Sequence, residues 1–87
     1  MKKNHEIPKW SKEFRVFCAR EGLTMKDVAE KAGIGVTTVS HYRTGKKLPR
    51  MNTCAKLKKG IGFDMYKALY ESYLEEQENE DGQQSEI

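Results

Sequence analysis

The fold is decided by residues 23–49, LTMKDVAEKAGIGVTTVSHYRTGKKLP, in which two short helical patterns are separated by a tight turn and followed by a basic loop. Thr24 is an N-cap residue with an aspartate three residues later, which is the spacing of a capping box. Gly33 ends the first helix, because glycine readily adopts the positive φ of a tight turn. We therefore predict helices at about 24–32 and 36–43.

The second of these helices has only a short apolar face and is otherwise mostly polar. Val39 and Tyr42 lie three residues apart and are predicted to face inward. Four polar side chains are predicted to face outward: Thr37, Thr38, Ser40 and His41. A helix this short and this polar does not form for packing alone. The arrangement is typical of a helix-turn-helix, in which the second helix lies in the DNA major groove.

Helical periodicity continues on both sides of this stretch. The preceding helix, which begins at Pro8 or Ser11, has an apolar face made of Trp10, Phe14, Phe17 and Cys18. The following helix has an apolar face made of Met51, Cys54, Leu57 and Ile61. A last helix is predicted after the N-cap residue Asp64. No segment alternates convincingly between apolar and polar residues, so the predicted class is all-α, a compact bundle of five helices.

The charges are distributed unevenly along the chain. Residues 1–60 carry 15 Lys or Arg and 5 Asp or Glu, a net charge of +10, whereas residues 61–87 carry 1 and 8, a net charge of −7. A basic body favours a polyanion such as nucleic acid, which would repel the acidic end. We predict a flexible N-terminus at 1–6, one domain at 7–75, and a disordered acidic tail at 76–87.

Several classes of protein are disfavoured by the sequence. It has no apolar run long enough to cross a membrane, and its N-terminus lacks the apolar core of a signal peptide. A cytoplasmic location in a bacterial or phage-infected cell is therefore expected. Cys18 and Cys54 lie on apolar helical faces and are predicted to be buried, reduced thiols. We find no metal-ligand cluster, phosphate loop or catalytic constellation, and we predict no enzyme activity, metal or cofactor.

The scaffold residues of the central stretch resemble the phage repressor/Cro family of XRE-like helix-turn-helix proteins. The matching residues are Leu23, Thr24, Val28, Ala29, Ala32, Gly33, Ile34, Val39, Ser40, Gly45 and Pro49. The resemblance extends over about residues 14–69 and implies a lambda-repressor-like DNA-binding domain. It also implies a sequence-specific regulator of transcription that binds double-stranded DNA, a repressor of phage or mobile-element type acting on a pseudo-palindromic operator.

The sequence departs from the family pattern in four ways. Met25 stands where the family usually has a glutamine that contacts phosphate, and Gly35 stands where a serine or threonine commonly caps the recognition helix. Cys18 and Arg43 occupy the positions of an arginine and a glutamate that form a buried ion pair in some members. Val36 replaces a frequent glutamine at the first reading position.

The candidate DNA contacts follow from this arrangement. Base reading is assigned to Val36, Thr37, Ser40 and His41, whose methyl, hydroxyl and imidazole groups can match groups in the major groove. Phosphate binding is assigned to Thr24, Thr38, Arg43, Thr44, Lys46, Lys47 and Arg50, with the four cations along one strand. The rival interpretations are an ordinary surface histidine at His41 and a solvated turn at Lys46 and Lys47.

The last predicted helix contains more tyrosines than one end of a small domain needs. Its apolar and aromatic residues are candidates for a homodimer contact: Met65, Tyr66, Leu69, Tyr70 and Tyr73. The simpler interpretation is that the tyrosines form the core and rim of this helix. A rival function is a protein-interaction module, an antitoxin-like or anti-regulator partner, that uses this helix to bind a regulatory protein. Met25 and Val36 keep that alternative open, because both replace residues that contact DNA in the family.

Overall fold

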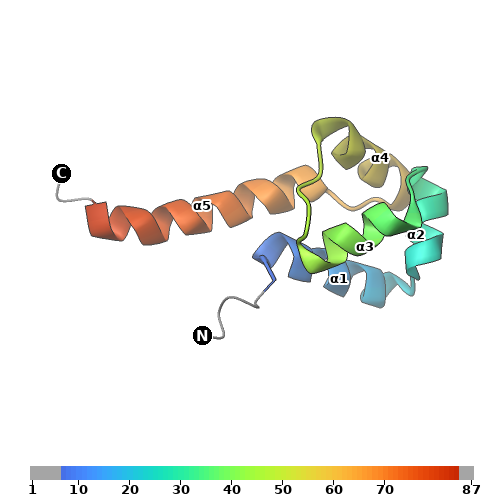
Figure 1. Ribbon diagram of the computed structural model, residues 1–87, viewed down its shortest axis with the longest axis horizontal. Coiled ribbons are helices and arrows are strands. Elements are labelled where there is room, and N and C mark those ends of the chain that lie inside the picture. Colours follow the sequence, from blue (N-terminus) through green and yellow to red (C-terminus); the bar gives the residue numbers. More distant parts are fainter. Residues whose placement is uncertain (1–6, 85–87) are drawn as a thin grey trace.

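The computed structural model describes the backbone of residues 7–84 and the side chains of residues 7–77. This part of the chain consists of five helices and contains no strand: α1 (Lys9–Glu21), α2 (Met25–Ala32), α3 (Val36–Thr44), α4 (Met51–Ile61) and α5 (Met65–Gln84). The first four helices gather at one end of the molecule, and α5 starts among them and extends away (Figure 1). The predicted all-α bundle is confirmed.

Local side-chain chemistry fixes the two ends of α2. The Thr24 hydroxyl accepts a hydrogen bond from the Asp27 N–H at 3.0 Å, and the Asp27 carboxylate accepts one from the Thr24 N–H at 3.0 Å. This capping box confirms the predicted start, and its bonds lower the pKa of Asp27. The box therefore stabilises the fold above the unfolded-state pKa, and this contribution is lost as the pH falls through the folded-state pKa. Gly33 has φ 72° and ends α2 as predicted.

The core lies where α1, α2, α3, α4 and the start of α5 meet. Its largest fully buried side chains are Phe14, Leu57, Met65, Val28 and Val39. The ring of Phe63, in the α4–α5 connection, packs against two α1 rings, with centroids 5.5 Å from Phe14 and 5.1 Å from Phe17. Val39 and Tyr42 face inward from α3 as predicted. Met51 was predicted to face inward from α4, but this prediction is wrong because its side chain is 68 % exposed.

Helices α2 and α4 approach each other closely at Gly60. A Cβ atom at this position would overlap the carbonyl oxygen of Lys31 and would lie 2.7 Å from the Cα atom of Ala32. Both atoms belong to the backbone at the end of α2, so a side chain cannot be accommodated by a rotamer change. Gly60 therefore sets the distance between α4 and the helix that supports α3.

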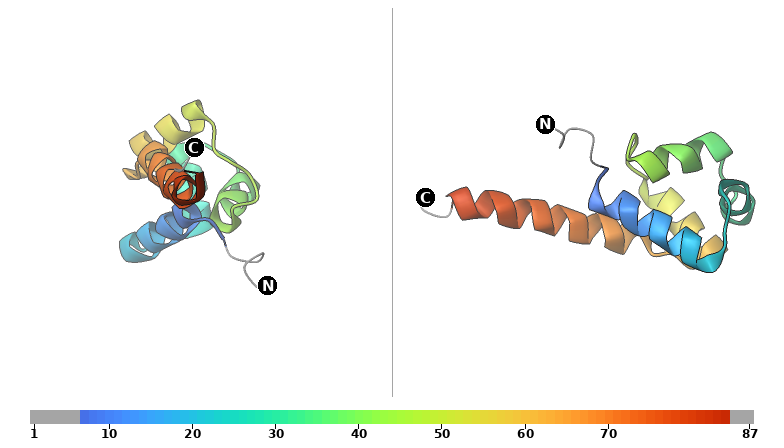
Figure 2. Two further views of the ribbon diagram at one scale, coloured as in Figure 1. Left: turned by 90° about the vertical axis from the view of Figure 1, so that its left-hand side faces the viewer. Right: turned by 90° about the horizontal axis from the view of Figure 1, so that it is seen from below.

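The C-terminal helix is longer than the sequence indicated. Asp64 caps it, because the Asp64 carboxylate accepts a hydrogen bond from the Lys67 N–H at 3.0 Å. Its backbone is helical as far as Gln84, beyond residue 75 where the domain was predicted to end. Glutamate and glutamine are good helix formers, which is consistent with a helix that projects from the domain (Figure 2). The residues predicted as a flexible N-terminus, and residues 85–87 of the predicted tail, lie outside the described part of the chain.

Candidate nucleic-acid interface

A polar groove runs beside α3, the predicted recognition helix. It has a volume of about 540 Å³ and lies between α3, the loop after it and α4. The predicted DNA contacts that line it are Thr37, Thr38, His41, Lys47 and Arg50. Thr53 and Lys56 of α4 also line it and were missed by the sequence analysis. The groove combines three cations with threonine hydroxyls, which are groups that bind phosphate oxygens.

The predicted base-reading residues lie on different sides of α3. Val36, 45 % exposed, lies at the N-terminal end and borders a second hollow, which Lys26 of α2 also lines. Thr37 and His41 border the groove of about 540 Å³ on the other side, while Ser40 is half-buried and lines neither hollow. Gly35 provides no side-chain cap, so the first N–H groups of α3 have no side-chain partner. Such a helix N-terminus favours an anion.

The predicted phosphate-binding residues divide into two groups. Lys47 and Arg50 face the groove together with Lys56, whereas Arg43 lies at the C-terminal end of α3 and does not line the groove. Only two of the four cations that were predicted to line one phosphate strand, Lys47 and Arg50, therefore lie at the groove. Lys46 is exposed, and its backbone N–H donates to the His41 carbonyl at 2.9 Å.

Two predicted threonine contacts are already engaged within the protein. The Thr24 hydroxyl accepts a bond inside the capping box, and its N–H is bound by the Asp27 carboxylate. The Thr44 hydroxyl is 3.2 Å from both the Ser40 and the His41 carbonyl oxygens, to which it donates. Thr24 can still donate its hydroxyl proton to a phosphate. Thr44 could do so only by giving up its hydrogen bonds to the carbonyl oxygens of α3.

Arg15 of α1 is a further cation near α3 that the sequence analysis did not single out. Its Nε atom donates to the Arg43 carbonyl at 2.9 Å. A signal was present in the sequence, because Ser11 and Arg15 are four residues apart and so share one face of α1, beside the apolar stripe. Similarly, Thr53 and Lys56 are three residues apart on α4. Only the packing of the helices shows which neighbour each face meets.

The tyrosines of α5 form an apolar surface with the start of α4. Tyr66, Tyr70 and Tyr73 are 54–56 % exposed, so they are not part of the core. They line a shallow pocket of about 240 Å³ whose other lining residues are Pro49, Met51, Cys54 and Leu69. Met65, also predicted as a dimer contact, is fully buried in the protomer and cannot reach a partner. We call this patch the tyrosine surface.

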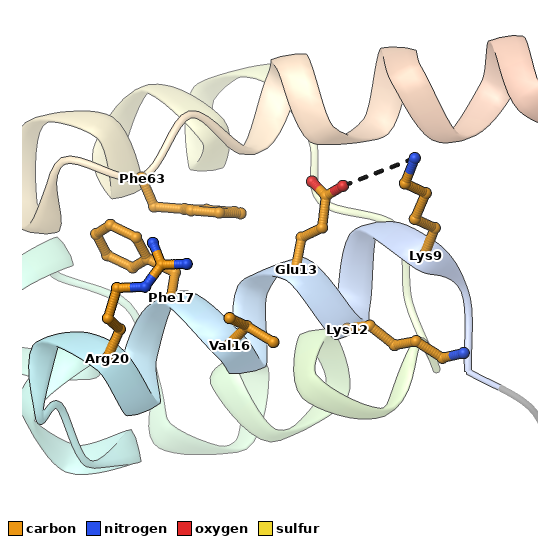
Figure 3. A pocket seen from close by; sticks show the side chains of 7 residues that line it. All are labelled: Lys9, Lys12, Glu13, Val16, Phe17, Arg20 and Phe63. Atoms are coloured by element: carbon orange, nitrogen blue, oxygen red, sulfur yellow. Dashed lines mark ion pairs between the residues drawn. The ribbon is translucent and has the colours of Figure 1, made fainter.

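A different hollow, of about 350 Å³, lies between α1 and the start of α5 (Figure 3). Its apolar floor is formed by Val16, Phe17 and Phe63, and its rim carries Lys9 and other charged side chains. Lys9 is 3.0 Å from a Glu75 carboxylate oxygen, and exposed pairs of this kind contribute little to stability. Although α1 packs against α3, none of the residues that line this hollow also lines the groove beside α3. This hollow is therefore not part of the nucleic-acid interface.

The two cysteines are part of the hydrophobic core. Cys18 and Cys54 are buried free thiols, and burial raises the pKa of each, so both stay protonated at neutral pH. Among the residues described, no three potential ligands come together to hold a metal ion. Over the same part of the chain, none of the helices has the length and apolar character needed to cross a membrane.

Comparison with known proteins agrees with this geometry. A helix-turn-helix family model matches residues 12–66, which is well over half of the chain. The chain therefore belongs to the XRE-like helix-turn-helix family, the family of the phage repressor/Cro proteins. It is a DNA-binding transcription regulator of this type, and the family is generally non-enzymatic. Searches of curated proteins and of solved structures found no match.

Proposed function

We propose that this protein is a repressor of phage or mobile-element type that binds a pseudo-palindromic operator as a homodimer in the bacterial cytoplasm. The observation that carries the proposal is the groove of about 540 Å³ in which α3 side chains and the cations of the following loop and α4 meet. Phosphates would occupy this groove while the exposed N-terminal half of α3 enters the major groove. Bound at a promoter, such a dimer blocks transcription.

Base discrimination is assigned to the outward side chains of α3. Thr37 and His41 lie one helical turn apart and border the same groove. A threonine methyl can contact a thymine methyl, and an imidazole N–H can donate to guanine N7 or O6. Val36 adds an apolar contact at the first position. We assign Ser40, which is half-buried, a smaller part in reading.

The first test is selection of the bound sequence from random duplexes, followed by gel-shift titration of the selected operator. Thr37→Ala/His41→Ala should reduce the preference for the operator over an unrelated duplex by roughly tenfold or more, since each base contact contributes about 1–3 kcal/mol. Its affinity for the unrelated duplex should change little. No enrichment of any sequence with the wild-type protein, or an unchanged preference in the double variant, would contradict the assignment.

The tyrosine surface is the proposed homodimer contact. Tyr66, Tyr70 and Tyr73 present aromatic rings to solvent together with Met51, and buried aromatic side chains dominate the energetics of many interfaces. Two half-sites one helical turn of DNA apart would require a symmetric pair whose recognition helices are separated by roughly 34 Å.

Sedimentation at micromolar concentration tests this contact. Tyr70→Lys/Tyr73→Lys should shift the protein from dimer to monomer, because an isologous interface then brings four ammonium groups together. The control is Val16→Lys, which replaces an exposed apolar residue of α1, outside this surface, and should leave the dimer intact. A wild-type monomer would exclude the homodimer. If DNA also failed to bind at low salt, the exposed tyrosine surface would favour the second candidate function, docking of a regulatory protein.

A further inference from the structure

The C-terminal end of α3 is held by side chains of α1. The Ser11 hydroxyl, fully buried, donates to the Tyr42 carbonyl at 2.6 Å. The Arg15 Nε–H donates to the Arg43 carbonyl at 2.9 Å. Carbonyl groups in the last turn of a helix have no intrahelical N–H partner, so these bonds satisfy groups that would otherwise need water.

The chain just outside the two helices makes a third contact at the same end. A Cβ atom at position 45 would overlap the ring of Pro8 and lie 3.3 Å from the Ser11 hydroxyl oxygen. Gly45 therefore allows the residue before α1 to pack directly on the residue after α3. The contact fixes the end of α3 relative to the start of α1.

The N-terminal end of α3 is joined to α2 by the turn at residues 33–35, in which the Gly33 and Ile34 N–H groups donate to the Ala29 carbonyl at 2.8 and 3.0 Å. Among the described residues, no side chain forms a capping hydrogen bond at this end. Gly35 has no side chain with which to cap the helix. Val39 and Tyr42 bury one face of α3, so close packing in the core opposes large rotations about the helix axis, but these apolar contacts form no directional bond. The polar contacts that restrict such rotation are concentrated at the C-terminal end, and both of the carbonyl contacts described above come from α1.

We propose that Arg15 is a positioning residue for base reading: its Nε–H fixes the last turn of α3, so that Thr37 and His41 keep one orientation relative to the phosphate-binding groove. This inference rests on the proposed function, because it requires sequence-specific binding. Arg15 does not need to touch a base. Its bond to a backbone carbonyl 28 residues further along the chain sets the orientation of the side chains that do.

The competing explanation is charge alone. The guanidinium of Arg15 is a cation near Arg43 and the C-terminal end of α3, where it can attract phosphate or interact with the helix dipole. The two roles predict different results for three substitutions. Gln has an N–H donor as many bonds from Cα as the Nε atom of Arg but carries no charge. Lys keeps the charge but has no nitrogen at that position, and Met keeps only the length of the side chain.

The experiment measures the ratio of affinities for the selected operator and for an unrelated duplex, by fluorescence anisotropy with the full chain. Arg15→Met and Arg15→Lys should lower this ratio roughly fivefold, about the contribution of one base contact. Arg15→Gln should stay within about twofold of the wild type. Arg20→Gln, an exposed cation of α1 away from α3, is the matched control and should leave the ratio unchanged.

The possible outcomes separate the inference from its competitors. Circular dichroism at the assay temperature shows whether each variant is folded, and a variant that is only less stable loses affinity for both duplexes equally, so its ratio is unchanged. An unchanged ratio in Arg15→Met would overturn the inference, as would a ratio restored by Lys but not by Gln. If the wild-type protein itself showed no preference, the proposed function would fail instead.

Discussion

Gly60→Ala is expected to lower the free energy of unfolding by roughly 3 kcal/mol or more, because the added methyl group overpacks a close helix contact. The sign is opposite to that expected from helix propensity, by which Ala is favoured over Gly by about 0.5–1 kcal/mol in a helix interior. The methyl group would overlap the Lys31 carbonyl oxygen, so α4 must move away from α2. Since domains of this size are stable by only about 5–15 kcal/mol, the loss is large.

Urea denaturation followed by circular dichroism measures this effect. Lys59→Ala is the matched control, since it changes the neighbouring, exposed residue of the same helix and should alter stability by less than about 0.5 kcal/mol. A Gly60→Ala variant as stable as the wild type would show that α2 and α4 separate at little cost. In that case Gly60 would not set the distance between them.

Lys47→Ala/Lys56→Ala is expected to weaken binding to all duplexes by roughly tenfold or more at moderate salt, without changing sequence preference. Both side chains line the groove beside α3, one from the loop and one from α4. If the wild-type interface neutralises about six to eight phosphates, the slope of log K against log[salt] is roughly −5 to −7. Loss of two contacts should make this slope less steep by about 2.

Gel-shift titrations at several salt concentrations give this slope. The control, Lys12→Ala/Arg20→Ala, removes the same charge from the hollow on α1 shown in Figure 3, and should leave the slope nearly unchanged. Equal slopes for the groove variant and the wild type would show that phosphates do not occupy the groove. Wild-type binding independent of salt would contradict the proposed interface as a whole.

The central motif could be predicted from sequence because its determinants are local. The Thr24 capping box, the turn at Gly33 and the inward positions Val39 and Tyr42 each depend on residues within a few positions of one another. The structure confirms all of them. Helical periodicity gave the correct number of helices for the same reason.

The remaining features depend on segments that are far apart in the sequence. Met51 has the spacing of an inward residue, but it lies beside the exposed α5 tyrosines and is itself 68 % exposed. Glycine is a poor helix former, yet Gly60 lies inside α4 against the backbone of α2. Lys56 and Arg15 lie near α3 only because α4 and α1 pack beside it. Residue spacing within a helix does not encode such neighbours.

The separation of inward and outward residues on α3 has a consequence for how this protein can diverge. Val39 and Tyr42 anchor the helix in the core, while Val36 and Thr37 are exposed and add little to stability. Substitutions at the exposed positions therefore cost little folding energy, so the set of operators recognised can change while the scaffold stays the same. Among duplicated copies in one genome, distinct control circuits can arise through a few changes among the exposed residues of this one helix.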